Sequence, residues 1–131
     1  MDDTSYSDVV TVSGDGQLIH VAGQLAFDDD RRVVGDDVKT MARRCLDRIE
    51  AHLGRVGAGL PHVVRITTLL VNLEDYPPST PCRPSGSAST GPPSTAYQVA
   101  GLLFGALVEI GAVAFLPGPN EGGRQGDRLS R

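Results

Sequence analysis

The clustering of prolines limits where this chain can form regular secondary structure more than any other feature of its sequence. Six of the nine prolines lie between Pro77 and Pro93. Proline has no amide hydrogen and costs about 3 kcal/mol in the interior of a helix. Fourteen of the 17 residues in this segment are Pro, Ser, Thr or Gly, so it offers no apolar stripe to bury. Regular secondary structure is therefore expected before residue 77 and after residue 93, and a helix is not expected between them.

Length and composition indicate one soluble globular domain. The chain has 131 residues, of which 40% are hydrophobic and 21% charged, as in ordinary folded domains. No apolar run approaches the ~18 residues of a transmembrane helix, and the acidic N-terminus lacks the pattern of a secretion signal. Two cysteines, Cys45 and Cys82, are too few for a disulfide framework or a metal cluster. We therefore expect a cytoplasmic protein that contacts no membrane and holds no metal.

The charge balance argues against nucleic acid as a partner. The formal net charge is −4, whereas a general nucleic-acid binder presents a positive face to the phosphates. We therefore expect no nucleic-acid partner.

Alternation predicts the strands that precede the first helix. Residues 18–27 alternate as in a strand, with His20 and Gln24 on the polar face. A Gly-Asp-Gly turn signal comes before this segment. A short strand over Val9–Val12 is therefore expected to pair with it as a hairpin.

Helical spacing of apolar residues predicts a helix from about Val38 to Val56. Asp36 or Asp37 can cap its first turn, and Gly57 can end it in the left-handed conformation. Cys45 lies on the apolar stripe with no basic residue beside it on that face. It is therefore predicted to be a buried, inert thiol and not a nucleophile.

Three further strands complete the predicted sheet. Val63–Val71 is mostly β-branched and aliphatic, which favours a buried central strand. Thr95–Leu102 and Ala106–Phe115 are predicted to follow the proline-rich segment. Residues 117–131 are rich in Gly, Pro and charge and are expected to form a disordered tail. This order predicts an α+β domain with a mixed or antiparallel sheet.

Glu109 is the strongest candidate for chemistry. Alternation along its strand gives it apolar or small neighbours on the same face, namely Leu107, Gly111, Val113 and Phe115. A carboxylate buried without a partner costs several kcal/mol or takes a raised pKa. Its position therefore indicates either a functional role or a structural hydrogen bond across a subunit interface.

Five ordered blocks make this chain similar to the Rid/YjgF family, the reactive intermediate deaminases. They cover most of residues 6–76 and 92–115, and the last two are the most specific. The blocks are Leu18–Leu25, Cys45–Ile49, Val63–Thr67, Gln98–Leu102 and Ala106–Ala114.

The resemblance implies one chorismate-mutase-like (YjgF-like) domain over residues 1–116, with a mixed sheet packed with helices. It also implies a homotrimer with a ligand cleft at each subunit interface. Members with the full site hydrolyse enamines and imines to 2-oxo acids and ammonia, without a metal or an organic cofactor. The family's second helix would fall at about residues 77–91, where the prolines argue against it.

The resemblance also assigns the candidate site. Glu109 matches the glutamate thought to orient the attacking water. Gly23 matches a position where backbone approaches the ligand, and Tyr6 resembles the aromatic that closes the cleft. Ser94 stands where active members have the arginine that grips a substrate carboxylate, and Thr80 falls near a family asparagine. A hydroxyl does not reproduce the two-pronged guanidinium contact.

Two functions remain open at this stage. One is a weak enamine or imine deaminase with Glu109 as its catalytic residue. The alternative is a noncatalytic protein of the same family that binds a ligand or serves as an oligomer, impaired in its proline-rich segment.

The proline-rich segment can be explained by a compensated frameshift. Reading GC-rich codons for residues 79–91 one base earlier yields an asparagine and an adjacent Trp-Phe pair, at about the family's spacing. The frameshift lies either in the gene or in its sequencing, and resequencing codons 77–94 decides between them. If the same frame is found and peptide mass confirms it, a sequence error is excluded.

Overall fold

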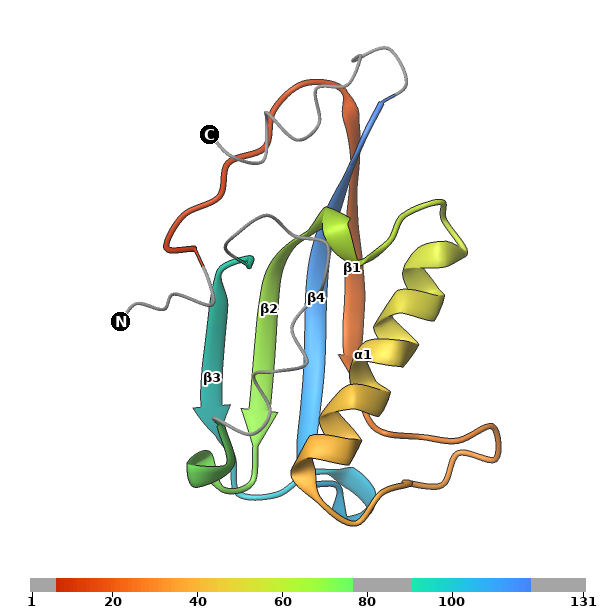
Figure 1. Ribbon diagram of the computed structural model, residues 1–131, viewed down its shortest axis with the longest axis vertical. Helices are drawn as coiled ribbons and strands as arrows, with labels where there is room; N and C mark the ends of the chain where they lie inside the picture. The colour runs from red at the N-terminus through yellow and green to blue at the C-terminus, as the bar shows by residue number, and fades with distance from the viewer. Residues whose placement is uncertain (1–6, 77–90, 119–131) are drawn as a thin grey trace.

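The computed structural model describes residues 7–76 and 91–118, which form a four-stranded sheet with one long helix against it (Figure 1). Among these residues, three short 3-10 helices lie in the connections. In chain order the elements are β1 Gly16–Gln24, α1 Val38–Gly54, η1 Leu60–His62, β2 Val63–Leu70, η2 Leu73–Asp75, β3 Ser94–Gln98, η4 Leu103–Gly105 and β4 Val108–Pro117.

The sheet is mixed, as predicted. Its strand order is β1-β4-β2-β3. β4 pairs antiparallel with both β1 and β2, while β2 and β3 run parallel. The long helix α1 packs against β1 and β4 on one face (Figure 1). The predicted α+β fold is therefore confirmed. Within the described residues, no helix has the length and apolarity needed to cross a membrane.

The core lies between α1 and the sheet. Cys45, Ile49 and Leu53 recur along one stripe of α1 and are fully buried. Val108 and Ala114 belong to the stripe of β4 that faces them, where every second residue is buried. Burial of such side chains contributes roughly 1.5–3 kcal/mol each, so this stripe holds α1 on the sheet. The prediction of Cys45 as a buried thiol is confirmed.

The ends of α1 follow from local chemistry. The Asp37 carboxylate accepts a 2.8 Å hydrogen bond from the amide of Thr40, as an N-cap does. Hydrogen bonds from the Thr40 hydroxyl and amide hold the pKa of Asp37 below its usual value. After the helix, Gly57 has φ +85°, a conformation that favours glycine. The predicted start is thus confirmed, and the helix ends two residues earlier than expected.

A β-bulge in β1 places Gln24 on the opposite face of the sheet from the predicted one. Val21 pairs with Ala112 and Gln24 pairs with Ile110, so two residues of β1 lie opposite Gly111 alone. The extra residue reverses the alternation beyond it. Gln24 consequently faces α1, although strict alternation predicted it beside His20 on the other face.

One predicted strand is absent, and the others differ from the observed strands in extent. Residues 9–12 form no strand, and Val9 is 73% exposed, so little burial holds this segment in place. β1 ends at Gln24 and β3 at Gln98, both earlier than expected. After β3 the chain turns through Phe104, which has φ +58°. Pro117 belongs to β4, and residues 119–131 of the predicted tail lie outside the described part of the chain.

Burial of Cys45 predicts a specific pH dependence. Desolvation raises the pKa of its thiol from 9.0 to about 12. The unfolded chain therefore loses this proton first, and the thiol's contribution to stability should fall as pH rises from about 9 to 12. The measurement is urea unfolding of Cys82→Ser, where Cys45 is the remaining thiol.

The control is Cys45→Ala/Cys82→Ser, which should lack this alkaline loss. Cys45 should also resist a thiol reagent at pH 8 until the protein unfolds. Rapid labelling of the native protein would contradict the buried placement.

Candidate functional site

Glu109 and Gly23 lie against each other on the face of the sheet opposite α1. Glu109 is the second residue of β4 and pairs with Leu69 of β2. Its neighbours Val108 and Ile110 point into the core, so its own side chain points to the other face. A Cβ added to Gly23 would collide with Oε2 of Glu109 and lie 2.8 Å from its Cδ. Only glycine leaves room here for the carboxylate.

Gly23 occupies this place because of the β-bulge. Its backbone also borders Gly111, where an added Cβ would lie 3.6 Å from the Gly23 Cα and amide nitrogen. The Glu109 side chain is half-buried, and within the described residues its carboxylate forms no ion pair. A carboxylate in this setting can accept a proton from a water molecule beside it.

Ser94 lies on the other side of the sheet. It begins β3 and pairs in parallel with Ile66, whose side chain is in the core on the α1 face. Paired residues share a face, so Ser94 faces away from Glu109 and is separated from it by strand β2. The fold of one chain therefore brings Gly23 and Glu109 together and leaves Ser94 apart.

The other two candidate residues cannot be placed. Tyr6 and Thr80 both lie outside the residues that the structure describes. The roles predicted for them stay predictions.

A polar cluster that the sequence did not predict adjoins the bulge. The Gln24 side chain, 9% exposed, contacts Arg48 Nε and His52 Nε2 of α1, each at 3.2 Å. The spacing of four between Arg48 and His52 places them on one side of the helix. This spacing was visible in the sequence, but alternation through an unrecognised bulge assigned Gln24 to the wrong face.

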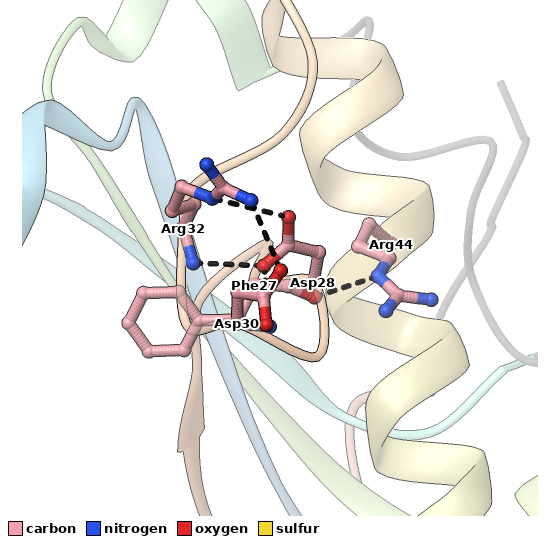
Figure 2. A network of polar contacts seen from close by, with 5 residues as sticks. All are labelled: Phe27, Asp28, Asp30, Arg32 and Arg44. Atoms are coloured by element: carbon pink, nitrogen blue, oxygen red, sulfur yellow. Dashed lines mark hydrogen bonds and ion pairs between the residues drawn. The ribbon is translucent and has the colours of Figure 1, made fainter.

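The loop after β1 is held by hydrogen bonds (Figure 2). The Asp28 carboxylate accepts bonds from the amides of Asp30 and Arg32, at 2.8 and 2.9 Å. The bond from the Arg32 amide is the main reason that the pKa of Asp28 is lowered. Arg44 Nε of α1 donates a 2.8 Å bond to the carbonyl of Phe27. These contacts tie the end of β1 to the helix.

Comparisons with known proteins agree with this architecture. The family model described as endoribonuclease L-PSP matches residues 2–116. A human protein named 2-iminobutanoate/2-iminopropanoate deaminase is 31% identical over 115 residues, covering 87% of this chain and 81% of its own. A RutC family protein from Pyrococcus abyssi is 31% identical over 111 residues, covering 84% and 85%.

Solved structures give the same picture. A Mycobacterium tuberculosis protein of the YjgF/YER057c/UK114 family has a TM-score of 0.67 and 30% identity, covering 77% of this chain and 80% of its own. RidA from an Antarctic Psychrobacter has a TM-score of 0.69 and 26% identity, covering 88% and 92%.

The contact between Gly23 and Glu109 predicts the effect of one methyl group. In Gly23→Ala the new Cβ should displace the flexible carboxylate end of Glu109, with little loss of stability. A double-mutant cycle with Glu109→Ala, followed by urea unfolding, should give a coupling energy of about 0.5 kcal/mol or more. Gly101→Ala is the control, because an added Cβ there meets nothing within 4 Å. Additive effects of Gly23→Ala and Glu109→Ala would contradict the contact.

Proposed function

This chain belongs to the Rid/YjgF family, whose model is described as endoribonuclease L-PSP, and on that premise we propose that it binds a small imine, enamine or carbonyl metabolite beside Glu109. The observation that carries the proposal is the half-buried Glu109 carboxylate lying on the bare backbone of Gly23. The glycine leaves the space beside its backbone to this carboxylate, which is only half-buried and so stays accessible to a ligand. The carboxylate supplies an acceptor for a water proton.

The proposed reaction is hydrolysis of a carbon–nitrogen double bond. Several mammalian relatives carry the name 2-iminobutanoate/2-iminopropanoate deaminase, which supports this class of substrate. Water adds to the imine carbon while Glu109 accepts one of its protons and passes it to the imine nitrogen, which gives a carbinolamine. Transfer of the hydroxyl proton to the same nitrogen lets ammonia leave, and the carbon becomes a carbonyl. One imino acid and one water thus yield one 2-oxo acid and one ammonia.

The ligand is proposed to lie in a cleft between subunits of a homotrimer. Ser94 supports this arrangement, because the subunit keeps it on the opposite face of the sheet from Glu109. If Ser94 contacts the same ligand as Glu109, it must come from a second copy of the chain. The site of this proposal is therefore incomplete in one subunit.

Ser94 also limits the proposed activity. A charge-assisted hydrogen bond to a carboxylate contributes roughly 1.5–3 kcal/mol, or about one to two decades in affinity. A serine lacks the charge and the second donor. We therefore propose weak deaminase activity toward 2-imino acids. The same feature favours the second candidate function, a family member that binds a ligand without consuming it.

The test is ammonia release from 2-iminobutanoate, generated in the assay by a pyridoxal-phosphate enzyme and followed with a semicarbazide trap. Ser94→Arg should improve kcat/KM by about 10- to 100-fold, because it restores the guanidinium contact. Glu109→Gln should lower kcat by about 10²- to 10⁴-fold, because it removes the proton acceptor.

Glu50→Gln is the matched control for Glu109→Gln, since Glu50 is an exposed residue of α1 and its loss should leave turnover unchanged. Robust wild-type turnover that Ser94→Arg does not raise would show that the arginine is dispensable. A ligand that raises Tm without being consumed, in wild type and in Ser94→Arg, would favour the noncatalytic function.

A further inference from the structure

The Gln24 side chain bridges the β-bulge and the helix. Its Nε2 donates a 3.0 Å hydrogen bond to the carbonyl of Ala22, within the bulge itself. Its Oε1 lies 3.2 Å from both Arg48 Nε and His52 Nε2 of α1. A single amide thus joins the backbone that precedes Gly23 to the helix.

The direction of each hydrogen bond follows from the arginines. Arg55 Nη1 lies 3.3 Å from His52 Nδ1, and a guanidinium can only donate. His52 Nδ1 is therefore the acceptor, and in the neutral ring the proton is on Nε2. Nε2 then donates to Gln24 Oε1, as does Arg48 Nε. With two donors at the oxygen, the amide nitrogen of Gln24 is the atom that must face the Ala22 carbonyl.

We propose that Gln24 is a positioning residue that holds the bulge so that Gly23 stays against the Glu109 carboxylate. Arg48 and His52 set its orientation, and the bond to Ala22 transmits that orientation to the backbone. A role of Gln24 in catalysis rests on the proposed function. The contact between Gly23 and Glu109, which Gln24 maintains, is independent of that function.

One substitution separates the two ends of the bridge. In Gln24→Glu, the carboxylate keeps an oxygen for Arg48 and His52, and the added charge strengthens both bonds. The other oxygen replaces the amide nitrogen and faces the Ala22 carbonyl without a proton to donate. The link to α1 is therefore kept while the link to the bulge is lost. Gln24→Met has similar length and loses both links.

The experiment compares Gln24→Glu and Gln24→Met with Gln17→Glu, which places the same new charge on an exposed position of β1. Three quantities are measured on each variant. They are Tm, the NMR resonances of the Gly23 and Ile49 amides, and the ¹³C resonance of the Glu109 side-chain carboxyl group. Where wild type turns over an imine, kcat and KM are measured as well.

For Gln24→Glu we expect a Tm close to that of wild type, a shifted Gly23 amide, an unshifted Ile49 amide and a shifted side-chain carboxyl resonance of Glu109. Where turnover exists, kcat should fall by about 10- to 100-fold with KM little changed, because small misplacement of a catalytic group has effects of this size. Gln24→Met should show the same Gly23 change together with a lower Tm. Gln17→Glu should resemble wild type throughout.

Wild-type Gly23 and Glu109 signals in Gln24→Glu would overturn the proposal, whatever the enzyme does. A Gly23 shift with a shifted Glu109 carboxyl resonance supports the positioning role even where the wild-type protein proves inactive. Failure of the proposed function and failure of this inference are therefore distinguishable. A kcat loss without any change at Gly23 would also overturn it.

Discussion

The site depends on one extra residue in β1 opposite Gly111. Without that residue the alternation of β1 would continue, and Gln24 would face away from α1. With it, Gly23 meets the carboxylate of Glu109 and Gln24 reaches the helix. A β-bulge is known to redirect a side chain in this way. Here it turns two neighbouring residues to opposite faces, Gly23 toward Glu109 and Gln24 toward α1.

The helix α1 therefore has two separate tasks along its length. Cys45, Ile49 and Leu53 form the apolar stripe that holds it on the sheet. Arg48 and His52 lie beside that stripe and bind the side chain of Gln24. Because one rigid element serves both tasks, packing of the core and placement of the bulge are linked. A loosened core would therefore shift the bulge and the position of Glu109, although no core residue of α1 reaches the opposite face of the sheet.

The elements that could be predicted from the sequence are those with a regular spacing of apolar residues. The spacing of Cys45 and neighbouring apolar residues located α1, and alternation around Glu109 assigned its face correctly. The five sequence blocks also identified the family that the comparisons show. The bulge was missed because it interrupts a period by one residue, and the partner strand that reveals it lies almost 90 positions further along the chain. Ser94 could be aligned from sequence, but its face depends on a parallel pairing that local patterns do not encode.

The parallel pairing of β2 with β3 places a geometric constraint on the connection from residue 71 to residue 93. Two neighbouring parallel strands need a connection that returns the chain to the starting end, usually of a dozen residues or more. Those 23 positions, 71 through 93, are a sufficient return path whatever their composition. The entropic cost of closing a connection rises only slowly with its length. Drastic sequence change between the strands is therefore compatible with the sheet, whereas a large deletion would separate β3 from β2.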